Sequence, residues 1–247
     1  MAAAPNLKFP PGKTLESEIS AAMERVAKWG VTYPEGYREL LLEKYRKSGV
    51  PYPHILMILG EPRIRGHFFY PHVLERDGPF LDYGCGTGDN IRQLLRDGFP
   101  RENLTGFDLT WKSLDLGFDL YRDRDEILDL FIVSPVPAFE REHYQTIYSG
   151  SVVHVIHDDD ELQKYLGNAW NALAPGGVFF GSTLGQEVGS ENTLDNRGIP
   201  RLVTRSELIQ FITEAGFSRP ELVVRPHEAH YAGDVKIKFE FCSRKEQ

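Results

Sequence analysis

The chain has 247 residues and a mass of 28.1 kDa, which suits one α/β domain with appendages and excludes a large multidomain machine. Hydrophobic residues make up 41% and charged residues 26%, so the chain can bury a core and is not expected to be disordered. The formal net charge is −8, from 28 basic and 36 acidic residues. Because no basic run could follow a phosphate backbone, nucleic acid is not expected as a partner.

Membrane insertion and disulfide bonding are not expected either. No apolar stretch approaches the roughly 18 to 20 residues of a membrane span, and residues 1–11 lack the regions of a secretory signal. We therefore expect a cytoplasmic protein, either a monomer or a homodimer. The two cysteines, Cys85 and Cys242, form no Cys-x-x-Cys pair, so neither a disulfide framework nor a zinc site is predicted.

Residues 1–78 are predicted to form a helical cap. Apolar residues spaced three and four apart predict a helix over 15–29. A second helix is predicted to begin near Pro34 and to end at Gly49. Its residues expected to face one way are Leu40, Leu41 and Tyr45. A third, shorter helix is predicted over 54–59.

Residues 79–247 are predicted to form the core of the protein, without a further domain boundary. Short apolar runs predict strands over 80–83, 104–109, 131–133, 146–149, 178–182, 221–225 and 235–241. Amphipathic helices are predicted over 89–98, 113–122, 159–173 and 206–215. This alternation predicts an α/β fold with a parallel sheet and helices on both faces. The N-terminal cap and the loop 185–200 are not needed by the sheet, so we expect them to cover its carboxyl edge.

A glycine-rich loop follows the first predicted strand. Residues 84–88 read Gly-Cys-Gly-Thr-Gly, and these glycines allow a tight turn and the close approach of a ligand. The dinucleotide fingerprint places its third glycine three positions after the second, so the G-x-G-x-G spacing disfavours a nicotinamide oxidoreductase. Asp82 precedes the loop, and Asp108 ends the next strand, where a carboxylate can accept hydrogen bonds from ribose hydroxyls.

Asp82, the glycine loop and Asp108 together resemble the class I S-adenosylmethionine (SAM) methyltransferases. The turn at 175–177, Pro-Gly-Gly, resembles the turn before the fifth strand of the same fold, and the resemblance covers about residues 79–243. It implies a Rossmann-like class I methyltransferase fold with a mostly parallel, seven-stranded sheet. It also implies SAM as the cofactor and S-adenosylhomocysteine as the product.

A closer resemblance lies in the segments 67–74, 90–100 and 108–117. They are similar to fungal secondary-metabolism methyltransferases of the meroterpenoid carboxyl type. This resemblance implies a small, apolar acceptor whose carboxylic acid is esterified. We expect methylation at oxygen, on a carboxylate or a phenol.

The resemblance also implies which residues bind the cofactor. They are Asp82, Gly84, Cys85, Gly86, Asp108, Leu109, Ser134, Ser149, Gly150 and Ser151. Asp82 would bind the cofactor's ammonium or only cap backbone amides. Leu109 would pack on the adenine or serve as a core leucine. Pro135 stands where the family usually carries an acid, so backbone groups near Ser134 would have to contact the adenine.

His154 is the candidate general base, as a phenol or alcohol acceptor would require, with a structural histidine as the alternative. A carboxylate acceptor is already ionised at neutral pH and would need no base. Residues that could line an acceptor pocket, or could be ordinary core and surface residues, are Tyr33, Tyr52, Arg65 and Tyr70, with Arg63 as a second arginine that could orient an anion. The acids at 158–160 are expected to cap a helix, so no metal site is predicted.

One alternative of a different class stays open. A SAM-binding protein of this fold could catalyse a cyclisation or serve in regulation without transferring a methyl group. The glycine loop does not distinguish this alternative, because both kinds of protein bind the cofactor. Accumulation of the demethylated cofactor in the presence of an acceptor would distinguish them.

Overall fold

The computed structural model describes residues 9–187, 201–227 and 237–246. Its seven-stranded sheet has the order β3-β2-β1-β4-β5-β7-β6. The strands are β1 Phe80–Tyr83, β2 Leu104–Asp108, β3 Phe131–Val133, β4 Tyr144–Gly150, β5 Leu173–Gly185, β6 Ser218–Pro226 and β7 Ile237–Arg244. Strands β1 to β5 pair in parallel, whereas β7 is antiparallel to both β5 and β6. The predicted mostly parallel, seven-stranded α/β fold is therefore confirmed.

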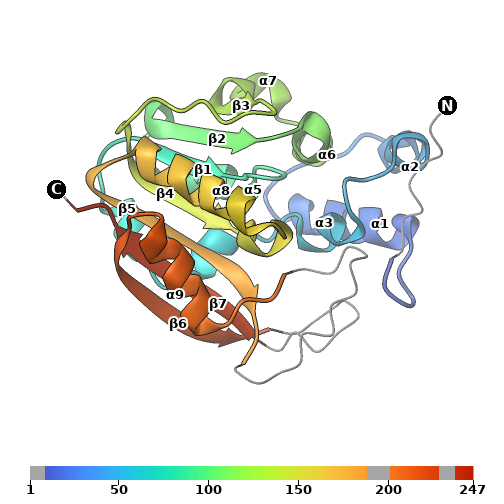
Figure 1. The fold of residues 1–247 in the computed structure, drawn as a ribbon. Helices are drawn as coiled ribbons and strands as arrows, with labels where there is room; N and C mark the ends of the chain where they lie inside the picture. Colours follow the sequence, from blue (N-terminus) through green and yellow to red (C-terminus); the bar gives the residue numbers. More distant parts are fainter. Residues whose placement is uncertain (1–8, 188–200, 228–236, 247) are drawn as a thin grey trace.

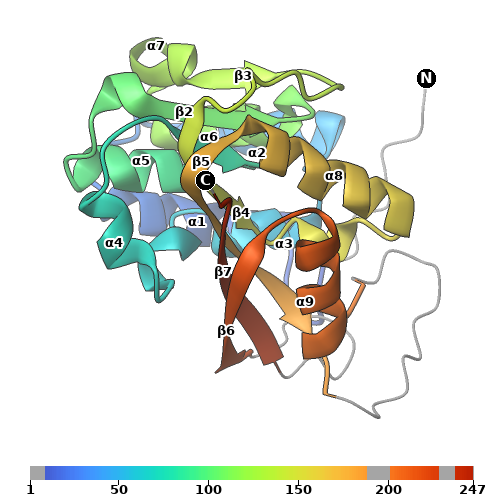
Figure 2. The same ribbon diagram turned by 60° about the vertical axis from the view of Figure 1, so that its left-hand side comes forward.

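Helices cover both faces of this sheet. The helices of the described residues include α1 Leu15–Ala27, α2 Tyr37–Ser48, α3 Pro53–Ile58, α4 Tyr70–Leu74, α5 Asp89–Arg96, α6 Trp111–Tyr121, α7 Arg124–Ile127, α8 Asp159–Ala172 and α9 Arg205–Glu214, and the short 3-10 helices η1 Arg63–Gly66 and η4 Val153–Val155. Figure 2 shows α4 and α5 on one side of the sheet and α8 and α9 on the other. No helix in the described ranges is long and apolar enough to span a membrane.

Each face of the sheet has its own apolar core. Phe80 and Phe180 point toward the α4–α6 face, whereas Leu81 and Phe179 point toward the α8–α9 face, because successive residues of a strand point to opposite sides. Both faces of the parallel strands are buried, so these strands read as continuous apolar runs in the sequence.

The N-terminal helices form a third apolar core together with α6. It contains the buried residues Ile19, Ala22 and Val26 of α1, Leu41, Leu42 and Tyr45 of α2, and Leu116, Leu120 and Tyr121 of α6. In Figure 1, α1 to α3 lie on the side toward which the arrow of β2 points. The helices therefore stand beside the carboxyl edge of the sheet, and α6 belongs to both the sheet and this third core.

The helices α4 and α7 were not predicted, and most of the other elements end within one to three residues of the predicted bounds. Two further differences concern the helix face of α2 and the start of β5. Leu40 is 58% exposed, and Leu42 is buried in its place, because Leu40 lies about 140° around the helix from the buried Tyr45. Strand β5 begins at Leu173 rather than at 178, because Leu173 already pairs with β4 before a register shift. Periodicity alone does not fix either feature.

The two cysteines are free and buried. Cys85 lies in the glycine loop and Cys242 lies on β7, and both side chains join the apolar core on the α4–α6 face. Burial raises the pKa of the Cys85 thiol well above its usual value, and burial raises the pKa of the Cys242 thiol to about 12.

Candidate functional site

The glycine loop is fastened to the neighbouring strand by its own backbone. The amides of Gly84 and Cys85 both donate to the Phe107 carbonyl, at 2.8 and 2.9 Å, and the Gly88 amide donates to the Cys85 carbonyl at 2.9 Å. Gly86 has a φ of 58°, and a Cβ atom built on it would meet no other atom within 4 Å. The loop therefore borders open space at Gly86, where a ligand can approach the backbone closely.

Asp108 joins this loop to the end of β2. Its Oδ2 accepts the Gly86 amide at 2.9 Å and its Oδ1 accepts the Thr110 amide at 3.3 Å. Burial raises the pKa of Asp108, although these amides act in the opposite direction. A carboxylate has about four lone-pair sites, so Asp108 can still accept hydrogen bonds from a ligand. Leu109, the next residue, is 54% exposed and offers an apolar surface beside it.

Asp82 lies fully buried on β1 just before the loop. Its Oδ2 accepts from the Asn90 side-chain amide at 3.1 Å, whereas its Oδ1 has no hydrogen-bond partner in the described parts of the chain. Burial raises the pKa of Asp82 to about 7, opposed by the Asn90 hydrogen bond and the charge of Arg63. A buried carboxylate oxygen without a partner is costly, so this site suits a ligand that brings a cation or a hydrogen-bond donor.

Two hydroxyls that the sequence analysis did not select lie on the same face as Asp82. Tyr148 pairs with Asp82 across β1 and β4, and Ser182 lies beyond Phe180, the β5 partner of Tyr148. Both are almost fully buried, and neither hydroxyl makes a hydrogen bond of good geometry within the described residues. Strand alternation places them on one face, but no feature of the sequence distinguishes them from ordinary core residues.

Two of the predicted cofactor residues turn their side chains away from the edge. The Ser149 hydroxyl lies 2.8 Å from the Tyr165 hydroxyl of α8, which in turn donates to the Tyr83 carbonyl at 3.0 Å. The Cys85 thiol is in the core, its amide donates to the Phe107 carbonyl of β2, and its carbonyl accepts the Gly88 amide. The side chains of Ser149 and Cys85 therefore support the site from within the fold, and neither offers a free polar group to a ligand.

The other predicted cofactor residues remain at the carboxyl edge. Gly150 is held free of a side chain, because a Cβ there would lie 2.6 Å from the ring of Tyr148. Ser151 has a φ of 62° and donates its amide to the Ser182 carbonyl at 2.7 Å. The Ser134 amide donates to the backbone carbonyl of Asp108 at 3.2 Å. These contacts bring the turns after β2, β3 and β4 to one edge of the sheet.

His154 is placed where it is a poor base. Its Nδ1 accepts the Leu184 amide at 3.4 Å and lies 3.4 Å from the Thr183 hydroxyl. Burial lowers the pKa of His154 to about 3, and the charge of Arg63 adds to this effect. Because base strength falls with pKa, these surroundings argue against the predicted general base and favour a neutral, structural ring.

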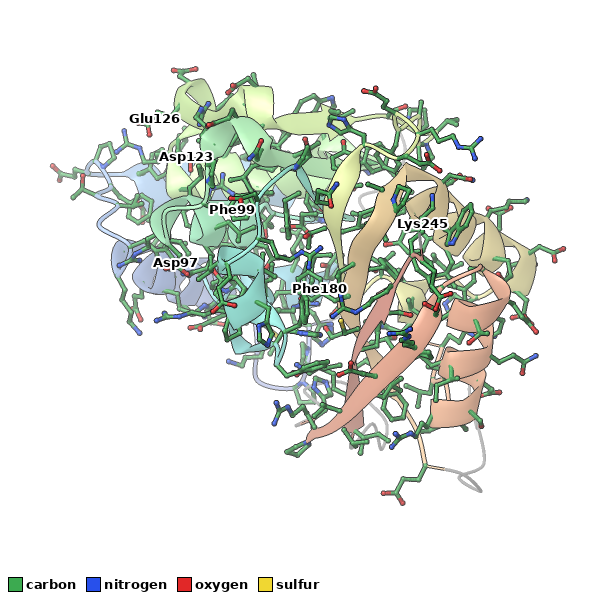
Figure 3. The ribbon with its side chains drawn as sticks, turned by 90° about the vertical axis from the view of Figure 1, so that its left-hand side faces the viewer. Asp97, Phe99, Asp123, Glu126, Phe180 and Lys245 are labelled. Atoms are coloured by element: carbon green, nitrogen blue, oxygen red, sulfur yellow. The ribbon has the colours of Figure 1, made fainter. Side chains whose placement is uncertain are left out.

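The hydroxyls of two predicted acceptor residues make hydrogen bonds within the chain. The Tyr33 hydroxyl donates to the Leu120 carbonyl at 2.7 Å in the third core. The Tyr70 hydroxyl donates to Asp97 at 2.6 Å, and Asp97, labelled in Figure 3, ends α5. The eight residues of α5 span about 12 Å, so Tyr70 lies one helix length from the glycine loop. The Tyr33 and Tyr70 hydroxyls therefore have partners within the fold, and a role of either residue in an acceptor pocket stays a prediction.

The two arginines of η1 differ in the groups that they affect. Arg65 lines a surface pocket between α1 and α5 together with Arg25, Lys28 and Arg96. The charge of Arg63, in contrast, lowers the pKa of both Asp82 and His154, so of the two arginines Arg63 acts electrostatically on the candidate site. Tyr52 is 45% exposed at the start of α3.

The acidic residues at the start of α8 cap the helix and form an ion pair. The Asp158 side chain accepts the Glu161 amide at 2.9 Å as the helix cap, and Asp159 forms an ion pair with Arg201 at 2.5 Å. The capping prediction is therefore confirmed for Asp158. Within residues 9–187, 201–227 and 237–246, no group of three or more His, Cys, Asp or Glu side chains could hold a metal ion.

Comparison with known proteins assigns this fold and site to a class. The family model of the methyltransferase domain matches residues 63–219, which is more than half of the chain. The chain therefore belongs to the family of methyltransferase domains.

The loop 185–200, which was expected to help cover the carboxyl edge of the sheet, lies mostly outside the described residues.

Similar proteins include fungal methyltransferases. Methyltransferase adrK of Penicillium rubens is 35% identical over 165 residues, which cover 55% of this chain and 58% of adrK. O-methyltransferase atr3 of Stereocaulon alpinum is 35% identical over 72 residues, which cover 28% of this chain and 21% of atr3. The chain thus matches less than two thirds of the length of either relative.

A solved structure shows the same fold. A SAM-dependent methyltransferase from Methanosarcina mazei superposes with a TM-score of 0.57 at 18% identity, covering 72% of this chain and 98% of that protein. At this identity the likeness concerns the fold alone.

Proposed function

We propose that the chain binds SAM at the carboxyl edge of the sheet and transfers its methyl group to an oxygen of a small organic acceptor. The observation that carries this proposal is the buried Asp82 carboxylate, whose unpartnered Oδ1 lies beside the glycine loop. In this assignment Asp82 holds the ammonium group, Asp108 accepts the ribose hydroxyls, and Leu109 packs on the adenine. Backbone groups near Ser134 and Ser151 complete the cradle.

The residues at the site fit the charges of this cofactor. Bound SAM supplies a methyl group on a cationic sulfonium. The chain's own task is to hold the reacting groups in line and to exclude water. Asp82 and Asp108 provide the negative charge that a cationic ligand requires, and both are largely buried.

Arg63 and His154 indicate which chemical group of the acceptor is methylated. A histidine whose pKa lies near 3 gives little help in removing a proton from a phenol. A carboxylate acceptor arrives ionised, and the positive charge of Arg63 beside the site can orient it. We therefore favour a carboxylate, and the similarity to fungal methyltransferases, one of them an O-methyltransferase, supports an acceptor from secondary metabolism.

The arrangement of the chain suggests which segment binds the cofactor and which segment selects the acceptor. We assign cofactor binding to residues 79–247 and acceptor specificity to the cap, residues 1–78, because the cap helices stand beside the carboxyl edge (Figure 1). We also propose that the protein is cytoplasmic and is a monomer or a homodimer. Gel filtration with light scattering would test the oligomeric state.

Calorimetry with SAM, S-adenosylhomocysteine and NAD tests the cofactor. We expect micromolar or tighter binding of the first two, no binding of NAD, and loss of binding in Asp82→Ala. Incubation with methyl-labelled SAM and a fungal metabolite extract, followed by mass spectrometry, then identifies the acceptor. Binding of NAD instead of SAM would refute the assignment, and SAM binding without any labelled product would favour a non-methylating role.

A further inference from the structure

The first turn of α5 holds the segment of the cap that follows α3, residues 60–64, here called the linker. The Asp89 Oδ1 atom accepts the Gly60 amide at 2.7 Å. The Asn90 Oδ1 atom accepts the Ile64 amide at 3.2 Å. Two neighbouring side chains of one helix therefore fix the linker backbone at two points.

The same two side chains also reach the candidate site. The Asn90 Nδ2 atom donates to Asp82 at 3.1 Å. The other oxygen of Asp89 accepts the hydroxyl of Thr87, a residue of the glycine loop. Each side chain thus bonds the linker through one atom and the cofactor site through another.

Helix α6 adds a second route from the cap to the loop. The Tyr121 hydroxyl donates to Asp89 Oδ1 at 2.5 Å, and the Tyr121 ring belongs to the third core, with the cap helices. Helix α6 also packs directly on the loop, because a Cβ on Gly117 would lie 2.1 Å from the Thr87 carbonyl oxygen.

Arg92 of α5 connects the glycine loop to the residues that follow α6. It donates to the Thr87 carbonyl at 2.6 Å and forms a two-pronged ion pair with Asp123 at 2.7 and 2.8 Å. Figure 3 labels Asp123, which follows α6. The guanidinium lies 4.2 Å from the centre of the Tyr121 ring. Loop, helix and cap core are thereby joined around one buried cation.

Burial makes these contacts depend on one another. Asp89 is 8% exposed, Tyr121 5% and Thr87 6%. Loss of one partner leaves a buried polar group of another unpaired, which costs more than the bond itself contributes. Displacement of the linker would therefore disturb the glycine loop, and displacement of the loop would disturb the linker.

We propose that Asp89 and Asn90 are positioning residues that couple the docking of the cap to the geometry of the cofactor site. Occupation of the site and docking of the cap then stabilise each other. Binding of the cofactor therefore favours the docked position of the cap at the carboxyl edge of the sheet. The cofactor's identity in this inference rests on the proposed function, whereas the coupling between linker and loop does not.

A matched pair of tyrosine variants tests the coupling. Tyr121→Phe removes the hydroxyl that reaches Asp89 and keeps the ring. Tyr45→Phe removes a hydroxyl from the same buried core. That hydroxyl donates to Asp119 of α6 rather than to Asp89. We expect Tyr121→Phe to weaken S-adenosylhomocysteine binding at least about fivefold and Tyr45→Phe to leave it unchanged. Equal Kd values in the two variants, at similar melting temperatures, would overturn the coupling.

Hydrogen exchange measures the coupling in the opposite direction, from ligand binding at the site to the linker. We expect S-adenosylhomocysteine to slow exchange of the linker amides about fivefold or more in the native protein, and we expect Asn90→Ala to abolish this protection. Asp89→Asn retains an acceptor oxygen for Gly60 and Tyr121, so it should keep more of the protection than Asp89→Ala. Protection that survives in Asn90→Ala and Asp89→Ala alike would refute the role of the pair.

A measurement without ligand separates this inference from the proposed function. In the free protein, Tyr121→Phe should speed exchange in the glycine loop 84–88 at least about fivefold more than Tyr45→Phe does. If the native protein failed to bind S-adenosylhomocysteine, the proposed function would fall while this comparison still decided the coupling. Equal loop exchange in the two variants would overturn it.

Discussion

Asp82 shows how burial sets up a residue for a charged ligand. Its carboxyl group has a pKa of about 7 because burial outweighs the Asn90 hydrogen bond and the charge of Arg63. The free protein therefore holds a proton on Asp82 in part of its molecules at neutral pH. A ligand ammonium would favour the ionised form, so ligand binding and loss of this proton are linked.

This linkage predicts a pH-dependent affinity. Below pH 7, binding of S-adenosylhomocysteine must first remove the proton from Asp82, so affinity should fall as the pH falls. Between pH 7.5 and 6, Kd should rise by at most about eightfold, measured by calorimetry. Asp82→Asn should bind more weakly and show little change over this range. A native Kd that is flat with pH would contradict the assignment of the ammonium to Asp82.

Asp108 supports a second prediction about a single carboxylate. Asp108→Ala removes the acceptor for the ribose and for the Gly86 amide, so S-adenosylhomocysteine should bind about 1.5–3 kcal/mol more weakly. Asp115→Ala is the control, because Asp115 forms an exposed ion pair with Arg124 on the neighbouring helix. Unchanged affinity in Asp108→Ala would exclude the ribose assignment.

Among the helices, α6 is distinguished by the close packing of Gly117 on the glycine loop. Alanine normally stabilises a helix interior by about 1 kcal/mol relative to glycine. In Gly117→Ala we expect the reverse, because the new methyl group would collide with the Thr87 carbonyl, at 2.1 Å. Thermal unfolding and calorimetry should show lower stability together with weaker ligand binding.

Gly167→Ala in α8 is the matched control. A Cβ there meets no atom within 4 Å, so this variant should gain up to about 1 kcal/mol in stability and bind the ligand normally. A Gly117→Ala protein as stable as Gly167→Ala would show that α6 can move away from the loop without cost.

Elements with strong local signals could be predicted from the sequence. Strand β3 lies where its short apolar run predicts it, and Asp158 caps α8 as its position before the helix indicates. Asp82 and Asp108 were selected because Asp82 precedes the glycine loop and Asp108 ends the next strand, a pattern that resembles SAM methyltransferases. The start of β5 was missed, because its pairing with β4 across a register shift depends on tertiary structure.

Long-range polar contacts could not be predicted in this way. Asn90 and Asp89 bond residues of the linker 26 and 29 positions away, and no spacing rule connects such pairs. Tyr33 and Tyr70 were selected as aromatic residues near the expected cap, but their hydroxyls have partners elsewhere. Composition does not show which aromatic residues face a ligand.

At the level of the whole molecule, the cap and the sheet are joined through α6. Removal of residues 1–78 would expose the apolar side chains of Leu116, Leu120 and Tyr121. Each costs about 1.5–3 kcal/mol when exposed, against a total stability of about 5–15 kcal/mol for a typical domain. We expect the fragment 79–247 to bind a hydrophobic dye and to lack a sharp thermal transition, as fluorescence and calorimetry would show. A cooperative, dye-free fragment would establish the core as an independent folding unit.

The burial of Cys85 and Cys242 has a practical consequence for spectroscopy. Both thiols are inaccessible and have raised pKa values, so little thiolate is present to react with maleimides at neutral pH. A cysteine introduced on the exposed surface of α2 could then be labelled selectively in the native sequence background. A second label on α8 would form a donor–acceptor pair, and single-molecule energy transfer could follow the distance between cap and core as ligand is added.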